Sequence, residues 1–186
     1  KPKLENLETL LITNKIFIER TAKVGLLPLD LAVNYGVTGP MLRGSGLKYD
    51  LRRVDGYSVY PELDFDIPIG TGAMGTVGDC WDRTYVRMQE CRESLKIIDQ
   101  CLTMLSSELK RDKDFNPRVL VPKKIRPKAG DYYVRAENPK GELGFFFRTD
   151  GRSDVPVRCK ARGCSFVNLS VLPEISKGVM ISDLIA

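Results

Sequence analysis

Apolar side chains recur every three or four positions between residues 79 and 105, and this spacing predicts one long amphipathic helix. The apolar positions are Trp81, Tyr85, Met88, Cys91, Leu95, Ile98, Leu102 and Leu105. Asp79 is a natural N-cap, and Asp82 places negative charge in the first turn, where the helix dipole favours it. The other faces are rich in charged residues, which is typical of a helix in a bundle or at a subunit interface.

The first part of the chain also predicts helices. Residues 4–24 have near-helical apolar spacing and predict a helix that stops at Gly25, and residues 29–35 predict a short second helix. Residues 36–46, GVTGPMLRGSG, contain four glycines and a proline, which indicates a loop. Within this loop we expect three residues to pack against the rest of the chain: Pro40, Met41 and Leu42.

The second part of the chain predicts short strands after a linker. Residues 106–130 are rich in Lys, Arg, Pro and Asp and show no clean period. The predicted strands are residues 132–137, 143–148 and 155–161, the first two joined by the turn NPKGE. Residues 165–171 predict a strand-to-helix transition, and residues 176–185 a short terminal helix.

These elements predict an α+β fold, with a helix-bundle core, one long amphipathic helix and a small antiparallel β-meander. We divide the chain into a mainly helical part at 1–109, a linker at 110–130 and the meander with its terminal helix at 131–186.

The amino-acid composition argues against several kinds of active site in this chain. The chain has 186 residues and a net charge of +5, with no apolar run near the roughly 20 residues of a membrane-spanning helix. Histidine is absent, which removes the commonest general base and the commonest metal ligand. The five cysteines form no C-x-x-C pair, which argues against a zinc site or a disulfide framework. We therefore predict no catalytic residue and no metal or cofactor ligand in this chain.

Two glycine-rich segments and several basic segments lack the features of a ligand-binding site. The loop at 36–46 lacks the lysine and hydroxyl pair of a nucleotide-binding loop, and the segment GTGAMGTVGD is best interpreted as a flexible insertion before the long helix. The basic segments lack interleaved aromatic residues, so we predict no nucleic-acid partner.

Three blocks of sequence resemble a known family. The first is NYGVTGPMLRGSGLKYDLRRVDGYSVY at 34–60, and the second is DFDIPIG followed by GDCWDRTYVRMQECRESLKIIDQCL at 78–102. The third is VRAENPKGELGFFF at 134–147. They are similar, in the same order, to the D-type (49-kDa) subunit of respiratory complex I. The resemblance indicates that residues 1–186 correspond to the carboxy-terminal portion of that subunit. The D-type subunit is itself a distant relative of nickel–iron hydrogenase large subunits.

The resemblance implies a hydrogenase-large-subunit-like fold and a role in a proton-pumping NADH:ubiquinone oxidoreductase. It implies a core subunit of the peripheral arm that scaffolds quinone reduction, with ubiquinone and a 4Fe–4S cluster held by neighbouring subunits. The implied partners are the terminal iron–sulfur subunit, the 30-kDa-type subunit and a chain or segment that carries the amino-terminal half. The implied location is the matrix side of the mitochondrial inner membrane, or alternatively the cytoplasmic face of a bacterial plasma membrane.

The chain departs from the family pattern in several places. The quinone-binding histidine and tyrosine of the family belong to an amino-terminal region that has no counterpart here, so this chain is either part of a longer polypeptide or one piece of a split subunit. Residues 71–77 form an unusual insertion, and Thr84 separates Arg83 from Tyr85. The cysteine spacing excludes a nickel site in this chain, although a hydrogenase-related complex and a non-redox assembly domain remain alternatives.

We expect the charged residues of the three blocks to be structural or interface residues. Arg43, Asp50, Arg52 and Arg53 should form an ion-pair network that holds the first block in place. A similar network is expected along the long helix from Asp79, Arg83, Arg87 and Glu90. Glu137, Lys140 and Glu142 should lock the hairpin turn. For all of these residues a salt bridge is a simpler role than proton transfer.

Overall fold

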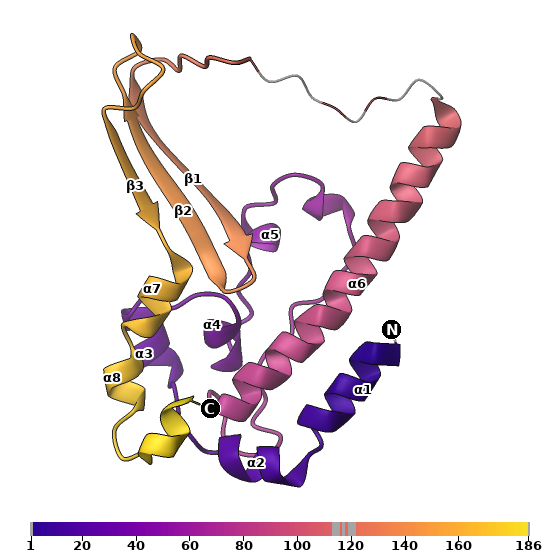
Figure 1. The fold of residues 1–186 in the computed structure, drawn as a ribbon, viewed down its shortest axis with the longest axis vertical. Helices are drawn as coiled ribbons and strands as arrows, with labels where there is room; N and C mark the ends of the chain where they lie inside the picture. Colours follow the sequence, from indigo (N-terminus) through magenta and orange to yellow (C-terminus); the bar gives the residue numbers. More distant parts are fainter. Residues whose placement is uncertain (1, 113–115, 117, 119–121, 186) are drawn as a thin grey trace.

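The computed structural model describes residues 2–112, 116, 118 and 122–185. A long helix, α6 (Cys80–Arg111), runs along one side of the molecule, and a three-stranded sheet runs along the other. Short helices lie between α6 and the sheet at the end where these two elements approach each other (Figure 1). The predicted α+β class is therefore confirmed.

Helix α6 begins where the sequence predicts and ends later. The Asp79 side chain accepts a hydrogen bond from the Asp82 N–H at 2.9 Å, which confirms the predicted N-cap. The helix continues to Arg111, so the prediction of a linker from residue 106 was wrong at its start. Leucines at 102, 105 and 109 extend the apolar spacing and sustain the helix. Residues 113–115, 117 and 119–121 of the predicted linker lie outside the described residues.

The single helix predicted for residues 4–24 is two helices, α1 (Pro2–Leu11) and α2 (Lys15–Thr21), so that prediction was wrong. The break occurs at Asn14, whose side chain accepts hydrogen bonds from the backbone N–H groups of Ile16 and Phe17. An asparagine at this position starts a new helix because its oxygen satisfies the free donors of the first turn. Helix α3 (Leu29–Asn34) confirms the predicted short second helix.

The predicted loop at 36–46 contains a helical turn, α4 (Pro40–Gly44), so the loop prediction was wrong in its second half. Gly39 has φ of 73°, and Pro40 at the first helical position has the φ value that a helix needs. Pro40 and Leu42 are buried and Met41 packs against the core, which confirms their predicted packing role. Two short helical segments follow, α5 (Leu51–Val54) and η1 (Tyr60–Glu62).

The sheet consists of β1 (Gly130–Asn138), β2 (Gly141–Thr149) and β3 (Arg158–Arg162) in the antiparallel order β1-β2-β3. This confirms the predicted meander, although its third strand begins later than residue 155. The register places Glu137 opposite Glu142, immediately before the tight turn between β1 and β2. The turn end of this hairpin is the end that approaches the helices (Figure 1).

The last part of the chain is helical. It contains α7 (Cys164–Leu169), α8 (Leu172–Ile175) and the 3-10 turn η2 (Ile181–Ile185). The predicted strand-to-helix transition at 165–171 was therefore wrong, because β3 has already ended at Arg162 and α7 begins at Cys164. The terminal helix predicted at 176–185 is found only over its last residues, as η2.

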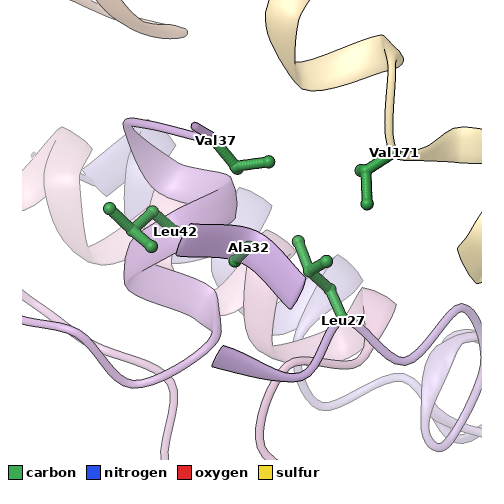
Figure 2. Close-up of a cluster of buried hydrophobic side chains, with 5 residues drawn as sticks. All are labelled: Leu27, Ala32, Val37, Leu42 and Val171. Atoms are coloured by element: carbon green, nitrogen blue, oxygen red, sulfur yellow. The ribbon is translucent and has the colours of Figure 1, made fainter. Parts of the chain in front are cut away.

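The core is formed by short helices and loops. Figure 2 shows Val171, from the C-terminal segment, facing a group of buried residues from one short stretch of chain: Leu27, Ala32, Val37 and Leu42. A second buried cluster joins Ile12 to Trp81 and Met88 on α6. In the described part of the chain α6 is the only helix longer than ten residues, and shorter helices pack against its first half. Among the described helices, none is both long enough and apolar enough to cross a membrane.

Candidate functional site

Arg43 of α4 is the centre of a buried charge cluster. Its side chain is 2% exposed, and its guanidinium contacts three carboxylates from separate parts of the chain. The Nε lies 2.6 Å from Glu90 Oε1 on α6, and one terminal nitrogen lies 2.9 Å from Glu137 Oε1 on β1. The same nitrogen lies 3.4 Å from Asp50 Oδ2. One side chain therefore links α4, α6, β1 and the start of α5.

Asp50 and Arg52 extend this contact. Asp50 is 1% exposed and accepts the Arg52 backbone N–H at 2.9 Å as the N-cap of α5. Its two oxygens also accept hydrogen bonds from the Arg52 Nε and a terminal nitrogen, at 2.9 and 2.6 Å. The second oxygen of Glu137 accepts the Leu51 N–H at 3.2 Å. We call Arg43, Asp50, Arg52, Glu90 and Glu137 the Arg43 cluster.

The carboxylates of the Arg43 cluster hold its two guanidiniums in the charged form, while burial raises the pKa of Glu90. Burial by itself disfavours a charge on Arg43, but the nearby negative charges of Glu90 and Glu137 outweigh it, so the pKa of Arg43 is raised. Burial likewise disfavours a charge on Arg52, and its hydrogen bonds to Asp50 reverse the effect and raise its pKa. Both guanidiniums are thus held firmly in the charged form, which suits positioning and not proton transfer.

Arg53, predicted to belong to the same network, has a different environment. It donates a hydrogen bond to the Phe65 carbonyl at 2.7 Å, and its guanidinium lies 4.0 Å from the centre of the Phe65 ring. Arg52 also lies over this ring, at 4.9 Å. Arg53 therefore holds the segment after α5 through a carbonyl and a cation–π contact.

Along α6 the structure does not assemble the predicted ion-pair network. The Asp79 carboxylate caps the helix and also accepts the backbone N–H groups of Lys23 and Thr76, at 2.8 and 2.9 Å. Arg83 donates to the carbonyls of Gly78 and Gly25, at 2.6 and 2.9 Å. Asp79 and Arg83 do not pair with each other, because backbone groups near the start of α6 form hydrogen bonds with both side chains.

The other two residues predicted for that network lie further along α6. Glu90 pairs with Arg43 on another element, as described above. Arg87 donates one hydrogen bond to the Arg83 carbonyl at 2.9 Å and lines a cleft of about 360 Å³ beside the Arg43 cluster.

The glycine-rich segment 70–78, predicted to be a flexible insertion, is tied to the start of α6. Asp82 is fully buried, and its Oδ2 accepts the Gly72 N–H at 2.9 Å. Among the described residues its Oδ1 has no hydrogen-bond partner. Burial, opposed by the Gly72 hydrogen bond and assisted by the charge of Asp79, raises the pKa of Asp82.

Around the hairpin turn, Glu142 is buried and accepts a hydrogen bond from the Tyr133 hydroxyl at 2.9 Å. Arg135 and Arg162 lie at ion-pair distances from its carboxylate, 3.6 and 3.9 Å. Lys140 contributes through its main chain, since its carbonyl accepts a hydrogen bond from the Asn168 side chain at 2.9 Å.

The sequence did not single out Asn168. This buried side chain accepts the Thr38 N–H and donates to the Thr38 carbonyl, both at 3.1 Å, while it also donates to Lys140. It therefore joins the segment before α4, the hairpin turn and α7. A lone asparagine in the apolar run FVNL carries no sequence signal for that role.

The described residues include all five cysteines, and they form no metal site. Cys80 and Cys164 are buried, Cys91 and Cys159 are exposed, and Cys101 is intermediate. No group of three or more cysteine, aspartate or glutamate side chains in the described part is arranged to hold a metal ion. What the site can do is fix the relative positions of helices and hairpin around one charged cleft.

Comparison with known proteins identifies close relatives. The family model "Respiratory-chain NADH dehydrogenase, 49 Kd subunit" matches residues 1–186. Over all 186 residues the chain is 71% identical to a D-type subunit of the NADH-quinone oxidoreductase of Cytophaga hutchinsonii and 65% identical to that of Amoebophilus asiaticus. It is 57% identical to the D-type subunit of Chlorobaculum tepidum. The chain spans 47%, 46% and 46% of these relatives, about half of their length.

Proposed function

Because the chain belongs to the family of the 49-kDa subunit of the respiratory-chain NADH dehydrogenase, we propose that it is part of a core subunit of a proton-pumping NADH:quinone oxidoreductase. In this proposal it scaffolds the quinone-reduction site in the peripheral arm, next to the subunit that holds the terminal iron–sulfur cluster. The observation that carries the proposal is the family match over residues 1–186, supported by high identity to the D-type subunits of bacterial NADH-quinone oxidoreductases.

The geometry supports a scaffolding role. The Arg43 cluster links four elements, and its two guanidiniums are held in the charged form by the neighbouring carboxylates. The cysteines do not converge, so we assign the 4Fe–4S cluster to a neighbouring subunit. Quinone reduction would then belong to the assembly, and this chain would bind no cofactor of its own.

Exposed apolar side chains support contacts with other protein chains. On α6, four residues spaced as one helical stripe are 42–56% exposed: Ile98, Leu102, Leu105 and Leu109. On the sheet, Val134 is 66% exposed, and Tyr132 and Phe145 are also exposed. Surfaces of this kind usually mark an interface. We propose as partners the terminal iron–sulfur subunit, the 30-kDa-type subunit and the remaining half of the D-type subunit.

The relatives named above come from bacteria, and they give no support to the expected mitochondrial location. We therefore propose the alternative expected from sequence, the cytoplasmic face of a bacterial plasma membrane, where the complex would transfer electrons to a membrane quinone.

Affinity purification from the native cells tests this function. A tag on the protein should recover a membrane complex that contains flavin and iron–sulfur clusters and reduces quinone with NADH. Cells with the untagged protein serve as the control. Recovery of stoichiometric nickel would favour a hydrogenase-related complex, and recovery of the protein without redox partners would overturn the proposal.

A further inference from the structure

Arg87 is the one arginine of the cleft without a carboxylate at ion-pair distance among the described residues. Its hydrogen bond to the Arg83 carbonyl uses one terminal nitrogen, which leaves the Nε and the other terminal nitrogen as donors. The neighbouring Arg43 and Arg52 are both matched by carboxylates. The Arg87 side chain lines the cleft together with Cys91.

Arg87 lies in an electrostatically unfavourable place. The guanidiniums of Arg43 and Arg52 are paired with the carboxylates of Asp50, Glu90 and Glu137, whereas Arg87 has no such partner in the described part of the chain and is repelled by Arg83 on the same helix. Protein atoms around the Arg87 guanidinium displace water, Arg83 repels it, and the attraction of Glu90 does not compensate, so the pKa of Arg87 is lowered. A negative charge beside Arg87 would stabilise its charged form.

We propose that the cleft is a binding site for one carboxylate group, which pairs with the guanidinium of Arg87. The planar guanidinium has two donors left in a geometry that matches a carboxylate. A single negative charge pairs with Arg87, whereas Glu90 and Glu137 at the cleft wall repel a dianion. The volume of about 360 Å³ accommodates a small carboxylate or the end of an acidic side chain.

The carboxylate has two possible sources, a small free molecule or an Asp or Glu side chain of a neighbouring chain. Cys91 reports on both, because it is exposed, lines the same cleft and lies one helical turn after Arg87, about 6 Å away by helix geometry. Alkylation of Cys91 by iodoacetate, an anion, and by iodoacetamide, which is neutral, can be followed by peptide mass spectrometry. Cys159 is also exposed and provides an internal reference far along the sequence.

The experiment uses the intact protein as purified with its partners. If the site takes a free carboxylate, Cys91 reacts in the wild type with a preference for iodoacetate that is on the order of threefold higher than in Arg87→Gln. Added acetate at constant ionic strength lowers that preference, and Arg87→Lys retains part of it. If a partner side chain occupies the site, both reagents modify Cys91 slowly, and Arg87→Gln, but not Arg87→Lys, accelerates both.

Lys96→Gln is the matched control, because it removes one positive charge from α6 at an exposed pair with Asp64, outside the cleft. It should leave Cys91 unchanged in both cases. The proposal is overturned if Cys91 is reactive with the same reagent preference in wild type and Arg87→Gln, or if it is protected equally in both. Neither NADH oxidation nor quinone reduction is measured, so failure of the proposed function would not be confused with failure of this inference.

Discussion

Among single residues, Arg43 organises the site, because its buried guanidinium contacts carboxylates from three different parts of the chain. A buried charge of this kind is stable only while its partners are present. Without the Arg43 guanidinium, the negative charges of Glu90 and Glu137 would be left partly buried with no positive partner. Both carboxylates would also lose their hydrogen bonds to Arg43.

Replacement of Arg43 by methionine should therefore lower the free energy of unfolding of the complete subunit by about 3–5 kcal/mol, since breaking a buried ion pair from one side strands the other charge. Urea denaturation of wild type and variant measures this. Arg148→Met is the control, because Arg148 pairs with Asp131 in an exposed position. Equal stability of the two variants would show that the Arg43 cluster does not hold the elements together.

The raised pKa of Asp82 predicts how the stability of the protein depends on pH. Its raised pKa means that the folded protein takes up a proton at a higher pH than the unfolded chain does, where aspartate has its ordinary value of 3.8. The buried charge is a cost above the raised pKa, and this cost is relieved as the pH falls through it. Relative to Asp82→Asn, which cannot titrate, the wild type should gain stability as the pH falls from above the raised pKa to below it. Parallel urea unfolding at a series of pH values measures the difference, and a constant difference would contradict the assignment.

At this scale the sequence predicted which residues matter better than it predicted their contacts. Arg43, Asp50 and Arg52 were expected to form a network, and the structure brings them together. Arg83 was expected to pair with a carboxylate and instead donates to two carbonyls. Which acceptor an arginine finds depends on the chain folded around it, and residue spacing contains no information about segments as distant as Gly25.

At the scale of elements, the hairpin packs against the start of α4 without room for side chains. Gly39 and Gly141 face each other, and both have positive φ angles. The Glu142 N–H donates to the Thr38 hydroxyl at 3.0 Å across the same contact. This close approach places Glu137 of the hairpin within reach of Arg43.

Gly39→Ala should disrupt this contact. A Cβ at position 39 would lie 2.5 Å from Gly141 Cα, and a φ of 73° is unfavourable for alanine. Together these effects should lower the free energy of unfolding by about 2 kcal/mol or more. Gly163→Ala is the matched control, since nothing lies within 4 Å of a Cβ there and φ is −83°. Thermal unfolding of both variants tests the difference, and similar melting temperatures would argue against a tight contact.

Elements with a strong periodic pattern were predicted correctly from the sequence. Elements whose boundaries depend on one or two turn-forming residues were not. The long helix and the first hairpin were predicted because many residues repeat one period. The break at Asn14 and the helical turn at Pro40 each depend on one or two residues whose alternative conformations are similar in energy. Tertiary contacts decide between such alternatives, so no local pattern could have settled them.

At the scale of the whole molecule, the far halves of α6 and of the sheet extend away from the shared core (Figure 1). Family membership could be predicted from sequence because the three blocks of residues are long and irregular. The cellular location could not be predicted, because the residues that build this scaffold do not depend on the type of membrane beside it.

The exposed stripe of α6 provides the last prediction. Leu102 is 56% exposed, so Leu102→Lys should leave the fold intact and act on association alone. A charge placed within an apolar contact costs well over 1 kcal/mol, so the yield of assembled complex should fall about tenfold. Ser107→Lys adds the same charge on the opposite side of α6 and should assemble normally. Native gel electrophoresis of membranes from the two strains measures the assembled fraction. Normal assembly of Leu102→Lys would mean that this stripe faces solvent in the complex and that the partner surface lies elsewhere, which leaves the sheet face around Val134 as the surface to test next.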